Sequence, residues 1–345
     1  MENISDNNFS GKIMLQDGFN RKLNYLRLSI TEKCNLQCIY CMPGEGICPD
    51  SNQNEIPFNE YLKLCKILVN LGINRIRITG GEPLLRPGLP SFIKSLKNLS
   101  SNLSVYLTTN AILLDRFFEE AVSNNSFPDG INISLDALDP KKLSKINSQG
   151  LQGLNGLQDP EQIISQVDKL LEKNILVKIN CVPITGYNDD ELVPLAMLAR
   201  DRKIDVRFIE LMPIGSAANY KNILGMETAG KIEKALGHLE FHKTDNNEAG
   251  PAIYYKLPGF KGRIGFINPI SHVFCDTCNR LRLSSRGKLK LCLSSDNELD
   301  LIDLIRNGCT DNEIIDLIVE FVKNKPHHHD LFNNKNNVGM FKIGG

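Results

Sequence analysis

Six of the ten cysteines in this chain fall into two compact groups of three. The groups are Cys34, Cys38 and Cys41, and Cys275, Cys278 and Cys292. No apolar run approaches the ~18 residues of a membrane span, and the N-terminal residues lack the apolar core of a signal peptide. We therefore expect a cytoplasmic protein that does not enter a membrane. Thiols stay reduced in that compartment, so the groups indicate metal or cluster binding rather than disulfides.

The first group has the spacing C-x3-C-x2-C and directly follows a predicted strand. Three thiolates leave one iron of a 4Fe–4S cluster without a protein ligand, and that iron can chelate the amine and carboxylate of a small molecule. A structural zinc site is the alternative, with Cys48 as its fourth ligand, because such sites use four protein ligands. Tyr40 lies between the last two cysteines, where an aromatic ring can pack on a ligand held at a cluster.

The second group has the spacing C-x2-C-x13-C, and Arg280 and Arg282 lie between its last two cysteines. Residues 261–290 contain seven Lys or Arg and one acidic residue, a local charge of +6 in a chain whose net charge is zero. Arginine presents a planar fork of donors to phosphate, so we expect a site for a multiply charged anion here. A zinc ribbon completed by His272 or Cys309 is the alternative.

Short β-rich runs alternate with helical stretches over the first two thirds of the chain. We expect helices at 58–71, which Gly72 would end, and at 159–173, which Pro160 would open. The predicted strands are residues 24–30, 75–79, 104–109, 131–136, 176–182 and 205–211. This alternation predicts an α/β fold with parallel strands and right-handed crossovers. Six units are too few for a closed eightfold barrel, so we expect an incomplete, laterally open (β/α)6 barrel.

Composition fits a folded globular protein: 345 residues, 41% hydrophobic, with 40 basic and 40 acidic side chains. The zero net charge excludes a globally basic nucleic-acid coat. We expect an N-terminal segment (1–22), a partial barrel (23–214) and a C-terminal region (215–345). That region should contain a helix at 230–242 and loops at 216–222 and 243–250. Composition favours a frayed tail over 333–345 and a solvated loop at His327–His329, because adjacent residues do not easily converge on one ion.

The first group resembles the hallmark of the radical S-adenosylmethionine (SAM) superfamily, C-x3-C-x-aromatic-C. Cys34-Asn-Leu-Gln-Cys38-Ile-Tyr40-Cys41 fits it at every position. Gly80-Gly81-Glu82-Pro83 follows the second predicted strand, as the GGEP motif of that superfamily does. Glycines at this place allow a close approach of the backbone to the methionyl amine of SAM.

Nearly the whole chain is similar to the GTP 3′,8-cyclase (MoaA) family of molybdenum-cofactor biosynthesis. The resemblance lies in LRLSITEKCNLQCIYCMP, RIRITGGEPLLRP, LTTN, INISLDALD, VKIN, VRFIELMP, GRIGFINPISHVFCDTCNRLRLSSRGKLKLCL and the terminal IGG. It implies a radical SAM lyase with two 4Fe–4S clusters, the second in the C-terminal extension. The 5′-deoxyadenosyl radical would abstract the 3′ hydrogen of GTP, and C3′ would then attack C8 to give (8S)-3′,8-cyclo-7,8-dihydroguanosine 5′-triphosphate.

The resemblance also assigns residues one at a time. The six grouped cysteines match the cluster ligands, and the second cluster would hold the guanine. Positions that contact SAM are matched by Tyr40, Gly81, Ser134 and Met212. Positions that contact GTP are matched by Arg27, Arg77, Thr108, Lys178, Arg280, Leu281 and Arg282. Gly344 and Gly345 match a double-glycine tail that enters the active site, which reverses the interpretation of a frayed tail. Ala111 departs from the family, which usually has glycine there.

The resemblance further implies an external one-electron donor of the flavodoxin or ferredoxin type. It also implies cyclic pyranopterin monophosphate synthase as the next enzyme, and a homodimer. Two alternatives remain: a radical SAM enzyme that modifies peptides, and a non-catalytic zinc protein that binds nucleic acid. Zinc predicts a colourless protein, whereas two four-iron clusters predict a brown protein with about eight irons.

Overall fold

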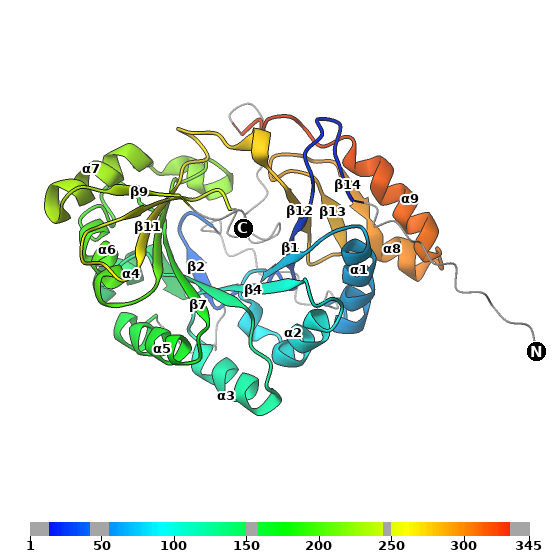
Figure 1. Cartoon of the computed structure of the whole chain (residues 1–345), viewed down its shortest axis with the longest axis horizontal. Helices are drawn as coiled ribbons and strands as arrows, with labels where there is room; N and C mark the ends of the chain where they lie inside the picture. The colour runs from blue at the N-terminus through cyan, green and yellow to red at the C-terminus, as the bar shows by residue number, and fades with distance from the viewer. Residues whose placement is uncertain (1–13, 42–54, 150–157, 244–249, 332–345) are drawn as a thin grey trace, which may run out of the picture.

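The computed structural model describes residues 14–41, 55–149, 158–243 and 250–331. Parallel strands form a curved arc with helices along its outer side (Figure 1). All six predicted strands are present, with ends close to the predicted bounds. They are β1 (Tyr25–Ser29), β3 (Arg75–Thr79), β4 (Ser104–Thr109), β5 (Gly130–Ser134), β7 (Leu176–Cys181) and β8 (Asp205–Ile209).

The helices between these strands begin and end at signals that the sequence contains. α5 (Pro160–Glu172) has proline in its first turn, and the Asp159 carboxylate accepts a hydrogen bond from the Glu161 amide. α1 (Phe58–Asn70) ends before Gly72, whose φ of 97° glycine adopts readily. The others are α2 (Leu89–Lys97), α3 (Leu114–Asn124), α4 (Pro140–Ile146) and α6 (Leu192–Asp201).

The C-terminal region lengthens the sheet at both edges. β12 (Arg280–Leu283) pairs in parallel with β1, and β11 (Arg263–Ile267) pairs in parallel with β8. Within the described residues the two ends of the sheet do not pair, so the barrel is laterally open as predicted, although its parallel part is wider than six strands. Antiparallel strands complete the sheet: β13 (Lys288–Lys290) and β14 (Glu298–Asp300) beyond β12, and β10 (Ile253–Lys256) and β9 (Glu240–His242) beyond β11.

The predicted helix at 230–242 is wrong over its second half. α7 (Gly225–Leu236) starts earlier, and Gly237 ends it with a φ of 103°. Residues 240–242 form β9 because the edge of β10 offers them a ladder of hydrogen bonds. The predicted loop at 216–222 contains a short 3-10 turn, Gly215–Asn219. The division at 214/215 stays a prediction, and the sheet runs across it.

Short elements complete the described part of the chain, and none of its helices is both long and apolar enough to cross a bilayer. These elements are β2 (Leu36–Cys38), which pairs with β6 (Asn147–Gln149), the 3-10 turns Pro83–Leu85 and Cys275–Thr277, and the helices α8 (Leu301–Arg306) and α9 (Asp311–Val322).

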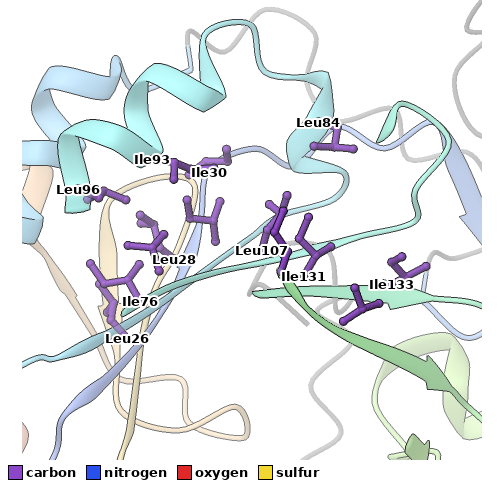
Figure 2. Close-up of a cluster of buried hydrophobic side chains, with 14 of the residues drawn as sticks. Leu26, Leu28, Ile30, Ile76, Leu84, Ile93, Leu96, Leu107, Ile131 and Ile133 are labelled. Atoms are coloured by element: carbon purple, nitrogen blue, oxygen red, sulfur yellow. The ribbon is translucent and has the colours of Figure 1, made fainter. Parts of the chain in front are cut away.

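The core lies between the arc and its helices, because alternate residues of each strand point outward. Leu26 and Leu28 of β1 and Ile76 of β3 pack with Ile93 and Leu96 of α2 (Figure 2). All five side chains are fully buried. Burying a Leu or Ile side chain contributes about 1.5–3 kcal/mol to folding. The same alternation sends the polar residues of each strand to the inner side of the arc.

Two glycine substitutions test the packing at the C-terminal side of the sheet. A Cβ on Gly262 would lie 2.1 Å from the Ile204 carbonyl oxygen, so Gly262→Ala should lower the free energy of unfolding by about 1–3 kcal/mol. Gly230 lies in α7 with open space around it, so Gly230→Ala should raise that free energy by about 0.5–1 kcal/mol. Urea unfolding at equal iron content measures both changes. Equal free energies for the two variants would contradict this packing.

Candidate functional site

A cavity of about 370 Å³ lies on the inner side of the arc, and both cysteine groups reach it. The first group contributes Cys41, and the second contributes all three of its members. Strand alternation supplies much of the remaining lining: Tyr25 and Arg27, Arg75 and Arg77, Tyr106 and Thr108, Asn132 and Ser134, Lys178 and Asn180, Arg207 and Ile209, and Arg280 and Arg282. Two centres that are far apart in the sequence therefore open into one chamber.

The first cysteine group follows β1 and lies at the carboxyl end of the strands, as the fold requires. Its three thiols are half-buried and form no disulfide. Burial raises the pKa of Cys34 to about 12, and burial together with the neighbouring Cys41 and Cys34 thiols raises that of Cys38. A cationic centre bound between the thiols would reverse this penalty, because metal binding favours the thiolate form.

The spacing of the sulfurs bears on the zinc alternative. A tetrahedral zinc holds its sulfurs about 2.3 Å away and hence about 3.8 Å from one another. Among the described residues, neither cysteine group brings three ligand atoms within 4.8 Å of one another. The described thiols are therefore not gathered around a single ion, and the choice between a cluster and zinc stays a prediction for both groups.

Glu82 of the GGEP segment fastens the first cysteine group to the neighbouring strand. Its carboxylate accepts hydrogen bonds from the Leu84 amide (2.9 Å), the Thr109 hydroxyl (2.8 Å) and the Asn110 amide (2.7 Å). The Asn110 side chain in turn donates to the side-chain oxygen of Asn35, next to Cys34 (2.8 Å). Burial raises the pKa of Glu82 to about 7 despite these donors. Sequence reasoning did not identify this network as support for the site.

The two glycines of the same segment are needed because there is no room for a side chain at either position. The sequence analysis did not anticipate this steric requirement. A Cβ on Gly81 would lie 2.2 Å from the Lys33 carbonyl oxygen, and one on Gly80 would lie 2.6 Å from that of Thr31. The Gly81 amide also donates to the Thr31 carbonyl at 2.8 Å. The segment therefore packs directly on the chain that leads into Cys34. Gly81 does not line the cavity, and its contact with SAM stays a prediction.

The other residues matched to SAM contacts do line the cavity: Tyr40, Ser134 and Met212. The Tyr40 hydroxyl donates to the Asp136 carboxylate at 2.7 Å, and that carboxylate also accepts from the Val182 amide at 2.8 Å. Burial, together with Asp136, raises the pKa of Tyr40. The tyrosine between the cysteines is thus fixed to the ends of β5 and β7, next to the first group.

The second cysteine group lies in the turn before β12 and in the loop after β13. Burial raises the pKa of the Cys278 thiol, but the charges of Arg280 and Lys325 outweigh it and bring it to about 7. The ammonium group of Lys325 donates to the carbonyls of Arg280 and Leu291, and this lysine is almost fully buried. These positive surroundings favour the thiolate of Cys278, which is the form that ligates iron, whereas burial raises the pKa of Cys275.

Six of the seven residues matched to GTP contacts line the cavity, all except Leu281. The Leu281 side chain is fully buried in the core, because it points outward between Arg280 and Arg282. Among the described residues, Nη1 of Arg77 and the hydroxyl of Thr108 are buried without a hydrogen-bond partner. Buried polar groups of this kind favour a bound ligand, since leaving them unsatisfied costs about 1–3 kcal/mol each.

The cavity is strongly positive. Its lining has six arginines and two lysines but only two carboxylates, Asp136 and Glu210. Burial and the nearby Arg282 lower the pKa of Arg27, and burial and Arg280 lower that of Arg282 to about 10. These shifts mean that the guanidinium groups lack water and repel one another. A polyanion would relieve both penalties.

The local charge of +6 does not form one patch. Only Arg280 and Arg282 of that segment line the cavity. Arg263 pairs with Asp205, Arg286 pairs with Glu32, and Lys288 and Lys290 pair with Glu298. The charge counted along residues 261–290 therefore overstated how much positive charge this segment contributes to the cavity.

Tyr25, Arg75, Arg207 and Lys325 also line the cavity and were missed. The sequence could have indicated the first three, because each occupies an inward position on a predicted strand. Each of these strands contains, or directly precedes, a residue that is matched to the family. Lys325 had no such signal. Lys178, which was predicted, is already paired with Asp205 at 3.0 Å and donates to the Tyr254 hydroxyl at 3.1 Å.

Some predictions lie outside the described residues: the role of Cys48 and the entry of Gly344 and Gly345 into the site. Ala111, by contrast, is described and adopts a left-handed φ of 67°. This is the conformation that glycine adopts without strain, which explains the glycine expected there. Cys65, on α1, is fully buried in the core.

Comparison with known proteins matches two family models to successive parts of the chain. Residues 28–199 match the family described as the radical SAM superfamily, and residues 204–331 match Molybdenum Cofactor Synthesis C. The structure of SuiB from Streptococcus suis bound to S-adenosylmethionine has the same fold, with a TM-score of 0.60 and 14% identity over 92% of this chain and 78% of that one.

Two bacterial curated relatives are similar to this chain over almost their whole length. A GTP 3′,8-cyclase from Alkaliphilus oremlandii is 40% identical over 337 residues, which cover 96% of this chain and 100% of that protein. One from Peptoclostridium acidaminophilum is 39% identical over 97% of this chain and 99% of that protein. Molybdenum cofactor biosynthesis protein 1 of Dictyostelium discoideum is 35% identical over 100% of this chain and 54% of its own length. The chain therefore belongs to the GTP 3′,8-cyclase family of the radical SAM superfamily.

Proposed function

We propose that this protein cyclises GTP to (8S)-3′,8-cyclo-7,8-dihydroguanosine 5′-triphosphate, the first step of molybdenum-cofactor biosynthesis. The observation that carries the proposal is that two three-cysteine centres and a desolvated group of arginines share one cavity. A radical enzyme that modifies peptides has no need for this charge, whereas a triphosphate matches it. Membership of the family, whose members are named for this reaction, supports the same conclusion.

Cys34, Cys38 and Cys41 would hold the cluster that binds SAM. When bound and reduced, that cluster supplies the electron that splits SAM into methionine and the 5′-deoxyadenosyl radical, which abstracts the 3′ hydrogen of GTP. The chain holds the cosubstrate beside this centre with Tyr40, Ser134, Met212 and Gly81. Glu82 and Asn110 keep the cysteine loop on the end of β4, so the position of the radical is set by the barrel.

GTP would lie across the same chamber, between the two centres. Arg27, Arg77, Thr108 and Lys178 bind its polar groups from the strands, and the segment Arg280–Leu281–Arg282 binds it beside the second cluster, Leu281 through its backbone. Cys275, Cys278 and Cys292 would ligate that cluster, which would supply an open iron for the guanine. Anchoring both ends of GTP would orient its 3′ carbon toward the SAM site.

The family relationship extends the proposal to partners. A flavodoxin-like or ferredoxin-like donor would deliver the electrons, and cyclic pyranopterin monophosphate synthase would consume the product. A homodimer is the oligomeric state that we propose. The decisive experiment is anaerobic incubation with GTP, SAM and dithionite, followed by detection of 5′-deoxyadenosine and the cyclised nucleotide. SAM cleavage with GTP left intact would exclude the proposed reaction.

Removing one thiolate should disable the first centre only. We expect Cys38→Ala to form no 5′-deoxyadenosine and to retain roughly half of the iron, about four atoms, because the second cluster is untouched. Cys309→Ala is the matched control, since Cys309 is a half-buried thiol that belongs to neither group. Iron and sulfide analysis with product chromatography measures both effects, and normal SAM cleavage by Cys38→Ala would disprove the assignment.

The buried hydroxyl of Thr108 gives a sharper test of the GTP site. Thr108→Val removes an unsatisfied donor, so the free energy of unfolding should stay the same or rise. GTP affinity should fall roughly fivefold, the equivalent of a hydrogen bond worth about 1 kcal/mol. Isothermal titration calorimetry and urea unfolding measure the two quantities.

Thr109→Val is the matched control for this substitution. Thr109 is the next residue of β4 and donates to buried Glu82, so its loss should lower the free energy of unfolding by about 1–3 kcal/mol. If Thr108→Val also destabilised the protein and left GTP affinity unchanged, the Thr108 hydroxyl would have a structural role and the contact with GTP would be wrong.

The lowered pKa of Tyr25 predicts that GTP binding depends on pH. Burial raises its pKa, but Arg77 and Arg27 outweigh burial and lower it to about 8. Above that pH the phenolate adds a negative charge among the arginines, so GTP affinity should fall about tenfold between pH 7 and pH 9. Because the folded-state pKa is depressed, ionised Tyr25 stabilises the fold above pH 10, and this contribution disappears as the pH falls through 8.

Tyr25→Phe should remove the pH dependence of GTP affinity while keeping the ring in place. Calorimetric titrations of both proteins across this range measure it, with buffer ionisation heats subtracted. An identical decline in the Tyr25→Phe protein would assign the effect to another group.

A further inference from the structure

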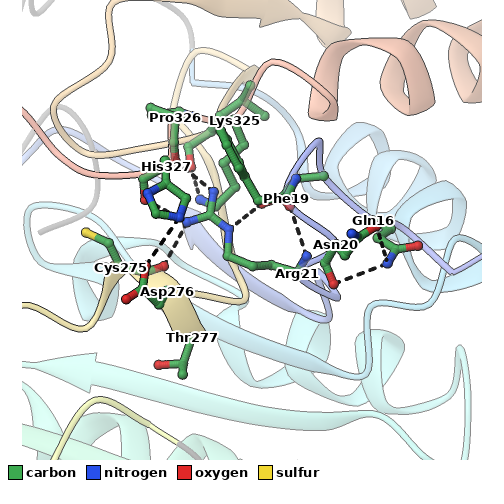
Figure 3. A network of polar contacts seen from close by, with 12 residues as sticks. Gln16, Phe19, Asn20, Arg21, Cys275, Asp276, Thr277, Lys325, Pro326 and His327 are labelled. Atoms are coloured by element: carbon green, nitrogen blue, oxygen red, sulfur yellow. Dashed lines mark hydrogen bonds and ion pairs between the residues drawn. The ribbon is translucent and has the colours of Figure 1, made fainter.

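Three potential metal ligands converge on the surface behind the second cysteine group. Asp276 lies in the turn between Cys275 and Cys278, and it faces His327 (Figure 3). His328 follows His327, near the end of the described chain. One ligand atom from each of the three lies within 4.8 Å of the other two. The sequence analysis expected adjacent histidines not to converge on one ion, and the structure contradicts that expectation.

The separations suit an ion better than hydrogen bonds. The carboxylate oxygen of Asp276 lies 3.4 Å from Nε2 of His327 and 3.7 Å from Nε2 of His328. Hydrogen bonds to such groups are about 2.7–3.2 Å long. A zinc ion holds nitrogen and oxygen ligands at about 2.0–2.2 Å, which places tetrahedral ligands about 3.3–3.5 Å apart. The Asp276 oxygen therefore lies about as far from each imidazole nitrogen as two ligands of one ion do.

The backbone that carries these ligands is fixed by Arg21. Its guanidinium donates to the carbonyls of Cys275 (2.7 Å), Pro326 (2.7 Å) and His327 (2.9 Å), and it pairs with Asp17 (Figure 3). The ring of Phe19 packs on that of His327 at 4.6 Å between centroids. One buried cation thus joins the two segments, so the ligands need little reordering to bind an ion.

The imidazole rings of His327 and His328 lie edge to face rather than stacked. Their planes lie at 86° with centroids 4.2 Å apart. His329, the third histidine of the tract, turns the other way: its Nε2 lies 3.0 Å from the Pro269 carbonyl oxygen, and it lines the cavity. The tract therefore divides into an outer pair and an inner residue.

We propose that Asp276, His327 and His328 form a surface site for a divalent transition metal ion of the zinc class. Two imidazoles and one carboxylate are ligands that Zn²⁺ accepts, whereas Mg²⁺ and Ca²⁺ prefer oxygen alone. The side chains are about half exposed or more, so solvent water can complete the coordination. The ion would link the turn that carries Cys275 to the segment that carries His327 and His328, through side chains that do not line the substrate chamber.

The test uses the full-length protein with both iron–sulfur clusters, under anaerobic conditions. Calorimetric titration with ZnCl₂ should reveal one site, and iron content measured before and after shows that zinc has not replaced iron. His327→Ala and His328→Ala should each weaken Zn²⁺ binding by at least about tenfold, the equivalent of about 1.4 kcal/mol. Both residues are exposed, so neither substitution should disturb folding.

His238→Ala is the matched control, because His238 is exposed and also lies beside a carboxylate, that of Glu233 at 3.0 Å, but without a second histidine. Its Zn²⁺ affinity should equal that of the unaltered protein. X-ray absorption at the zinc edge should show two imidazoles, and one in His328→Ala. The proposal is overturned if no zinc binds, if zinc binding always accompanies loss of iron, or if the three histidine variants bind equally.

Discussion

The alternation of side chains along parallel strands is the constraint on which the rest of this structure depends. Each strand of the arc has to bury one set of residues against helices, and the next set then faces inward. Leu26 and Leu28 enter the core in this way, while Tyr25 and Arg27 enter the cavity. Shifting any strand by one residue would bury charge in the core and fill the chamber with aliphatic groups.

Collecting cations in one chamber lowers stability, and the protein compensates locally. Asp205 pairs with Lys178 and Arg263, and aromatic rings of Tyr25 and Tyr106 lie under the guanidinium of Arg77. These partners reduce the repulsion without neutralising it. The remaining positive potential would attract a triphosphate. Binding of the substrate would therefore relieve part of the repulsion among these cations.

The C-terminal region does more than add a second cysteine group. Because β12 continues the sheet beyond β1, Arg280 and Arg282 take inward positions in register with Tyr25 and Arg27. The two centres therefore share one frame, and their separation is set by backbone hydrogen bonds rather than by a flexible linker. Arg21 reinforces this frame by binding the carbonyls of Cys275 and Pro326 from the N-terminal side.

Much of the molecule could be predicted from local sequence. Strand positions follow from apolar periodicity, the start of α5 from Asp159 and Pro160, and the cysteine groups from their spacing, because each of these signals lies within a few residues. Most residues matched to SAM or GTP contacts then proved to line the cavity. Gly81 and Leu281 do not line it, and Leu281 faces the core because its neighbours face the chamber.

The remaining features depend on segments distant in sequence, which only the tertiary structure brings together. The predicted C-terminal end of the helix at 230–242 was wrong because residues 240–242 pair with the edge of β10. The glycines of the GGEP segment meet the carbonyls of Thr31 and Lys33 across a turn that no periodicity reveals. Asp276 meets His327 because Arg21 joins their segments. The sequence by itself thus determined which ligands and charged side chains this chain contains. Packing between distant segments decided which of them lie together.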